Sequence, residues 1–175
     1  MRRFVVLFTL LLASCTNPSD PRNSLAGGML ATIDKLEASG QLPKLDRSDS
    51  LLGPDVDHDG IRDDIDKYIE VIAAEKKYTR QQTMAMRQVA RDFQHILAID
   101  ISDKKQLAAA SNEEARVISC LFFRFNGEDV ENVSDFIQSV TYNTKQRVVA
   151  YANYNSALSG SVTSLPPDDA TSCDE

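Results

Sequence analysis

Apolar side chains recur every three or four residues along most of this chain, which is the spacing of one face of an α-helix. No stretch alternates between apolar and polar residues with a period of two, so strands are not predicted. The inward positions of the expected helices are Leu30, Ile33, Leu36, Ile65, Tyr68, Ile69, Ile72, Ala73, Met86, Val89, Phe93, Ile96, Leu97, Ile118, Leu121, Phe122, Phe125, Val133, Phe136, Ile137, Val140, Thr144, Val148 and Tyr151. The pattern predicts an all-α fold: a small bundle of four to five helices over residues 29–160, then a polar tail, residues 161–175.

Capping residues locate the expected helix ends. Thr79 with Gln82, and Ser111 with Glu114, both have the spacing of a capping box, in which each residue satisfies a backbone donor of the other. We therefore expect one helix to begin after Thr79 and another after Ser111. The pair Asn126-Gly127 is expected to stop the second of these, and the last long helix is expected to run unbroken to residue 159.

The first residues have the layout of an export signal. Arg2 and Arg3 precede the apolar run 4–12, which is too short to span a bilayer because a spanning helix needs about 20 apolar residues. Leu12-Ala13-Ser14-Cys15 follows and resembles the lipobox of bacterial lipoproteins. The resemblance implies a signal peptide of residues 1–14 and lipidation of Cys15. The alternative, a buried N-terminal strand or helix, would not need paired arginines ahead of it.

Residues 15–28 are rich in Pro, Ser, Asn and Gly and are interpreted as a flexible tether behind the lipid. By resemblance to lipoprotein sorting, the residue after the lipidated cysteine matters, and Thr16 at that position, rather than Asp, favours the outer membrane over retention in the inner membrane. The resemblance therefore implies a bacterial cell-envelope protein, anchored by lipid in the outer membrane and facing the periplasm. The net charge of −7 becomes −9 when Arg2 and Arg3 are removed, and such an acidic chain is not expected to bind nucleic acid.

Two cysteines remain after Cys15. Cys120 lies in an apolar stretch and Cys173 in the polar tail. An oxidising compartment permits a disulfide between them, which would attach the tail to the core and contribute about 4 kcal/mol by loop-closure entropy. The alternative is a buried, inert Cys120 with a free Cys173.

The strongest functional signal is the segment 55–66, DVDHDGIRDDID. Calcium takes six to eight oxygen ligands, which a twelve-residue loop supplies from positions 1, 3, 5, 7, 9 and 12. Those positions are Asp55, Asp57, Asp59, the Ile61 carbonyl, Asp63 and Asp66. Gly60 occupies position 6, where the chain turns sharply. The segment predicts a calcium site; a solvated acidic loop and a magnesium site are the alternatives.

This loop resembles the EF-hand loop and, more closely, the Asp-rich loops of thrombospondin type 3 repeats and dockerins. It departs from the EF-hand at position 12, where Asp66 replaces Glu, and at position 8, where Arg62 replaces an apolar residue. Gly53-Pro54 directly precedes the loop and disfavours an entering helix. With only the exiting helix present, we expect a structural site rather than a calcium switch.

No catalytic residues are predicted. His58 occupies a non-ligand position of the loop, His95 is a lone helical histidine, and the chain has no nucleophile elbow, phosphate loop or zinc-protease motif. The leading hypothesis is a non-enzymatic module that binds another envelope protein or stabilises an assembly. The alternatives are a small hydrolase acting on peptidoglycan or another glycan, and an inhibitor or immunity-type protein. The remainder of the chain is similar to small exported bacterial proteins of uncharacterised activity.

Overall fold

The computed structural model describes residues 34–174, and no strand is present among them. The signal peptide, the lipidated Cys15 and the tether all lie outside the described residues, as does the start of the helix expected before Gly40, of which residues 34–38 are helical. The labelled elements are α2 (Asp63–Lys76), α3 (Arg80–Ile96), α4 (Lys104–Arg124), α5 (Gly127–Thr141), α6 (Lys145–Ala157) and the 3-10 turn η1 (Ala170–Ser172). The all-α prediction is confirmed.

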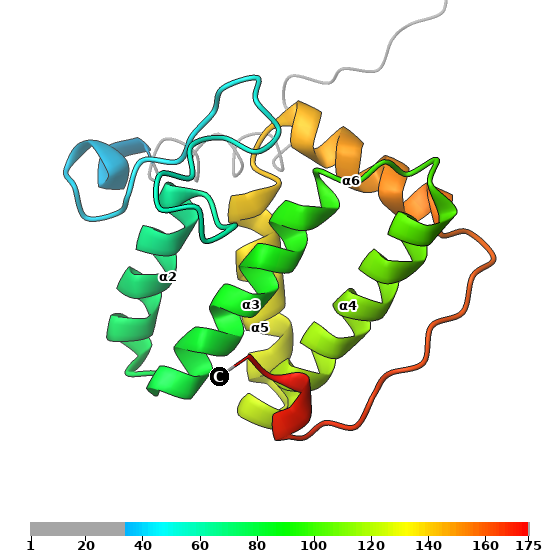
Figure 1. Ribbon diagram of the computed structural model, residues 1–175. Coiled ribbons are helices and arrows are strands. Elements are labelled where there is room, and N and C mark those ends of the chain that lie inside the picture. Colours follow the sequence, from blue (N-terminus) through cyan, green and yellow to red (C-terminus); the bar gives the residue numbers. More distant parts are fainter. Residues whose placement is uncertain (1–33, 175) are drawn as a thin grey trace, which may run out of the picture.

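Helix α3 is the centre of the bundle. It packs against α2, α4 and α5, with α5 behind it and α6 crossing the upper end of α4 (Figure 1). The inward positions predicted for α3 are all buried: Met86, Val89, Phe93, Ile96 and Leu97. The predicted capping box of α3 is also present, with Thr79 accepting from the Gln82 amide. Among the described residues, no helix combines the length and the apolar character that crossing a membrane requires.

The start predicted for α4 is wrong. The helix begins at Lys104, where the Asp103 side chain accepts hydrogen bonds from the Lys105 and Gln106 amides. The intervening alanine-rich residues are strong helix formers, so Ser111 and Glu114 lie inside the helix instead of capping it. Glu114 consequently faces inward, and the Tyr154 hydroxyl donates to its carboxylate at 3.0 Å.

The prediction of one unbroken last helix is also wrong, because the chain forms two helices there, α5 and α6. Thr144, expected on the inward face, is the N-cap of α6, and its hydroxyl accepts from the Arg147 amide at 3.3 Å. A threonine side chain that bonds the backbone competes with helix continuation, which the hydrophobic periodicity alone does not register. Two further predicted core positions are exposed: Phe122 by 48% and Val148 by 51%.

The predicted disulfide between Cys120 and Cys173 is present, with an S–S distance of 2.02 Å. After α6 the chain passes outside α4 and returns to its lower end (Figure 1). Gln88 donates to the Ser172 carbonyl at 2.9 Å, and its side-chain oxygen accepts from the Asp174 amide at 3.0 Å. The C-terminal residues are therefore fixed to the bundle by both the disulfide and α3.

Candidate functional site

The acidic segment 55–66 forms a compact loop held by its own hydrogen bonds. The Asp55 carboxylate accepts from the Gly60 amide at 3.1 Å, which folds the loop back on itself. His58 and Gly60 both have positive φ, 59° and 85°, so the chain turns sharply at these two positions. Ile61, only 1% exposed, inserts into the core and anchors the loop.

Three of the predicted ligands come together. Asp55, Asp57 and Asp63 each offer a carboxylate oxygen, and these oxygens lie within 4.8 Å of one another. Asp63 is oriented by the Val56 amide, which donates to its Oδ1 at 3.0 Å. The second oxygen of Asp55 is buried without a hydrogen-bond partner. Because a buried carboxylate oxygen needs a positively charged or donor partner, this cluster could hold a metal ion.

The other predicted ligands lie differently. The Asp59 carboxylate accepts from the Ile61 amide at 2.9 Å, and its carbonyl accepts from Arg91 Nε at 2.8 Å. Asp66, on the first turn of α2, pairs with Arg87 of α3, whose Nε lies 2.9 Å from Asp66 Oδ1. The structure thus joins the carboxylates of positions 1, 3 and 9, while those of positions 5 and 12 have partners within the protein.

The Asp66 carboxyl is held in a crowded acidic environment. Burial raises its pKa, Arg87 opposes that rise, and the neighbouring charges of Asp59, Glu70 and Asp57 raise the pKa further. A cation bound in the loop would relieve this repulsion. The electrostatics therefore connect Asp66 to the loop even though its direct partner is Arg87.

Arg62, an unexplained departure from the EF-hand pattern in the sequence, is a structural anchor. Its side chain is completely buried, and it donates to the Val140 carbonyl at 2.9 Å and the Thr141 carbonyl at 3.4 Å, at the C-terminus of α5. Its Nε pairs with Asp64. Gly53 lies against this side chain with φ of 69°, and a Cβ there would collide with it. The loop is therefore fixed to α5 through position 8.

A second buried arginine fixes the segment that leads into the loop. Arg147 of α6 is fully buried and donates to the carbonyls of Asp46, Ser50 and Leu51 at 2.7, 2.8 and 3.0 Å. It also pairs with the Asp46 carboxylate at 2.6 Å. Sequence reasoning missed this residue because its partners are about a hundred residues away in the chain.

Asp92 is another buried ionisable residue that sequence reasoning missed. It is 3% exposed, and neither carboxylate oxygen has a hydrogen-bond partner. Its spacing from Val89 and Ile96 places it on the buried face of α3. The helical periodicity of the sequence could therefore have indicated that Asp92 is buried. His58 and His95, by contrast, are both exposed.

Comparison with known proteins identifies no relative: no protein-family model, curated protein or solved structure matches this chain.

Proposed function

We propose that this chain is a lipid-anchored protein of the bacterial cell envelope whose helical domain binds a structural calcium ion and another envelope component without enzymatic activity. The observation that carries the proposal is the cluster of Asp55, Asp57 and Asp63, whose carboxylate oxygens lie within 4.8 Å of one another. The lipobox-like residues 12–15 support the anchor, and the acidic charge disfavours nucleic acid as a partner.

Calcium suits this cluster better than magnesium. Calcium is a hard cation that accepts irregular sets of carboxylate and carbonyl oxygens, whereas magnesium requires near-octahedral geometry and retains its water ligands. The loop offers several carboxylates and the Ile61 carbonyl on a sharply turned backbone. The buried Asp55 oxygen without a partner is a further place for such an ion.

A structural role is favoured by the way the loop is held. Arg62 fixes one side of it to the C-terminus of α5, and Arg91 fixes the Asp59 carbonyl to α3. The segment before it, residues 51–54, is not helical, so no helix leads directly into the loop for calcium to move. An ion in this loop would strengthen the bundle and keep its surface in one conformation for a partner.

Calcium should therefore raise the thermal stability of the mature protein, and Asp57→Ala should remove that effect. Extracellular modules bind calcium with dissociation constants near 0.1–1 mM, so 10 mM calcium should add about 1.4–2.7 kcal/mol to the unfolding free energy. Melting curves followed by circular dichroism, with calcium and with EDTA, measure this. Asp135→Ala, an exposed acidic residue on α5, is the matched control and should retain the full calcium effect. Equal calcium shifts in Asp57→Ala and wild type would refute the site.

The membrane anchor is tested separately through Cys15. We expect the wild-type protein in the detergent phase of a Triton X-114 partition of whole cells, and Cys15→Ala outside it, because several acyl chains contribute about 0.8 kcal/mol per buried CH₂. Ser19→Ala, in the predicted tether, should partition like wild type. Recovery of Cys15→Ala in the same phase and with the same mobility as wild type would exclude lipidation at this residue.

A further inference from the structure

A basic groove runs along the outer side of α3, next to the candidate metal loop. It consists of two adjoining cavities of about 400 and 310 Å³, which share Arg80, Met84 and Asp174. The first cavity reaches Asp59 of the loop, and the second reaches Arg124 at the end of α4. The groove is large enough for a small ligand or a headgroup.

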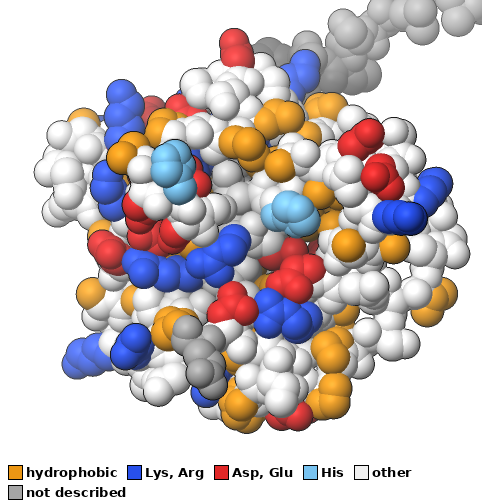
Figure 2. All heavy atoms as spheres, viewed as in Figure 1, with side chains coloured by type: hydrophobic (Ala, Val, Ile, Leu, Met, Phe, Trp, Pro, Cys, Tyr) orange, Lys and Arg blue, Asp and Glu red, His pale blue; other side chains and the backbone are white. Residues whose placement is uncertain are grey.

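Arginines line this groove in a regular pattern. Arg80, Arg87 and Arg91 lie seven and four residues apart, which places them on one side of α3. Figure 2 shows basic side chains in a band directly beside the acidic side chains around the loop. This local positive charge is unusual in a chain with a net charge of −7. Arginine presents a planar fork of donors that matches the oxygens of a phosphate group.

Two of the lining arginines have no acidic partner among the described residues. Arg91 pairs with Asp174, and Arg87 pairs with Asp66 and Glu70. Neither Arg80 nor Arg124 has an ion pair within residues 34–174; the Arg124 guanidinium lies over the Phe123 ring, 4.7 Å from its centroid. Among residues 34–174, these two guanidinium groups are the groove arginines that could donate to an anion without first breaking an ion pair.

The groove shares residues with the metal loop. Arg91 donates to the Asp59 carbonyl, and the Gly60 backbone lies against the Arg91 side chain. Arg87 Nε and Asp66 Oδ1 are 2.9 Å apart, yet both atoms are buried without an aligned hydrogen bond. The charge that partly neutralises Arg87 thus comes from a residue at the twelfth position of the predicted calcium loop.

We propose that this arginine groove binds a phosphate group and that calcium in the adjoining loop strengthens the binding. The inference rests on the calcium site proposed above. A calcium ion among the loop carboxylates offsets the negative charge of Asp66, so less of the positive charge of Arg87 is neutralised within the protein. The same ion offsets the negative charge of Asp59, which lines the groove beside Arg91. Reciprocity requires phosphate to strengthen calcium binding by the same factor.

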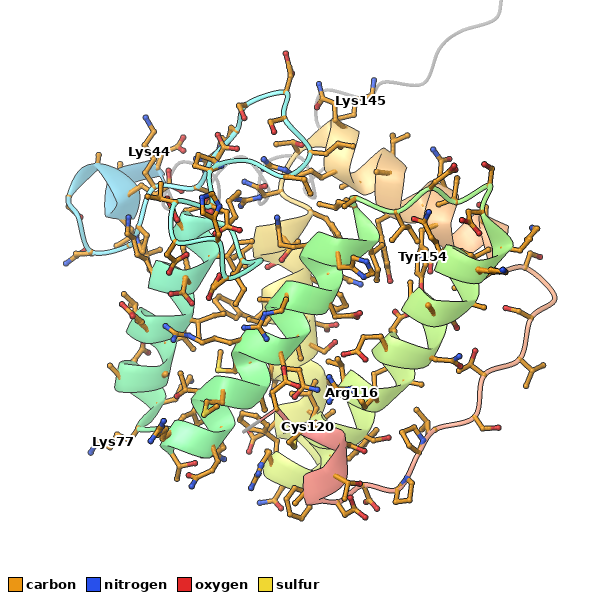
Figure 3. The ribbon with its side chains drawn as sticks, viewed as in Figure 1. Lys44, Lys77, Arg116, Cys120, Lys145 and Tyr154 are labelled. Carbon is orange, nitrogen blue, oxygen red and sulfur yellow. A yellow bond between two sulfur atoms is a disulfide. The ribbon has the colours of Figure 1, made fainter. Side chains whose placement is uncertain are left out.

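The test is isothermal titration calorimetry of the mature protein with glycerol phosphate, in calcium and in EDTA. We expect the dissociation constant for glycerol phosphate to be at least about fivefold lower in calcium, the lower end of typical coupling between sites. Arg80→Gln and Arg124→Gln should each weaken binding about tenfold or more, because each removes a charge-assisted contact. Lys145→Gln, an exposed charge on α6 far from the groove, should bind like wild type (Figure 3).

A second arm identifies the source of the phosphate. Phosphatidylcholine vesicles containing phosphatidic acid are compared with vesicles of phosphatidylcholine alone, in calcium, with the Cys15→Ala protein so that lipidation contributes nothing. Binding to the first vesicles and loss in Arg80→Gln indicate a lipid headgroup; binding of glycerol phosphate alone indicates a soluble phosphate. Asp57→Ala controls for calcium that bridges lipid and protein without using the loop.

The outcomes separate this inference from the function on which it rests. If calcium stabilises wild type but neither phosphate probe binds, phosphate binding in the groove is refuted and the proposed calcium site is still supported. If phosphate binds equally in calcium and EDTA and is lost in the arginine variants, the coupling is refuted. If binding persists in both arginine variants, phosphate binds elsewhere and the groove is again refuted.

Discussion

Replacing Arg147 with methionine is expected to lower the free energy of unfolding by about 3–5 kcal/mol, the range for breaking a buried ion pair by removing one partner. The guanidinium is fully buried and pairs with Asp46, while also donating to three carbonyls of the segment 46–51. Methionine fills a similar volume but leaves these acceptors without donors. Urea unfolding followed by circular dichroism measures the loss.

Lys145→Met is the matched control on the same helix, since Lys145 is exposed and its replacement should change stability by less than about 0.5 kcal/mol.

The pH dependence of the ion pair between Asp46 and Arg147 provides an independent measurement. Burial alone would raise the pKa of the Asp46 carboxyl, but hydrogen bonds from Arg147 and Ser48 hold that pKa below its ordinary value. This interaction stabilises the fold above pH 3.8 and is lost as the pH falls below it, so Arg147→Met should show less acid sensitivity than wild type. A loss under 1 kcal/mol would show that water replaces the arginine.

The helices could be predicted because apolar periodicity is a local property of the sequence. Met86, Val89 and Phe93 lie on the buried side of α3, as their spacing indicates. The same pattern cannot distinguish one continuous helix from two helices when the apolar residues keep the same spacing across the break. At Thr144 a side-chain cap decided the outcome.

The acidic loop could be located because all of its predicted ligands lie within one short stretch of sequence, residues 55–66. Asp55, Asp57 and Asp63 come together, whereas the predicted ligands Asp59 and Asp66 have other partners within the protein. Arg62 and Arg147 could not be placed in the same way, because each meets carbonyls or a carboxylate brought close only by the folded chain. A buried arginine looks like a surface arginine until its distant acceptors are known.

The groove along α3 illustrates the same limit. Arg80, Arg87 and Arg91 have helical spacing in the sequence, yet such a stripe is equally typical of a solvated helix face. Their importance depends on Asp66 and Asp174, which the fold brings to α3 from α2 and from the C-terminus. Tertiary structure therefore turns a common pattern into a candidate binding site next to the acidic loop.

Asp92→Asn is expected to stabilise the protein at pH 7 by up to about 4 kcal/mol, although it changes a single atom of the side chain. Burial, followed by the charges of Glu114 and Glu113, raises the pKa of Asp92 to about 8, with Arg116 opposing the rise. In the folded protein the carboxyl therefore stays protonated up to that pH, whereas in the unfolded chain it ionises near its ordinary value of 3.8. The native state binds the extra proton between these two values, so the unfolding free energy of wild type falls as the pH rises through this window. Asparagine cannot ionise and should remove this loss.

Urea unfolding at a series of pH values from 4 to 8 checks the prediction, with the difference between Asp92→Asn and wild type growing by up to about 1.4 kcal/mol for each unit of pH. Near pH 4 the two proteins should differ in stability by less than about 1 kcal/mol, because the wild-type carboxyl is then neutral in the folded state and only about half ionised in the unfolded chain, where its ordinary pKa is 3.8. Asp135→Asn, at an exposed position of α5, should show no such divergence. A stability difference for Asp92→Asn that does not depend on pH would refute the raised pKa of Asp92 in the folded protein. The growth of the difference with pH is therefore the decisive quantity, because an altered side-chain packing would shift the stability equally at every pH.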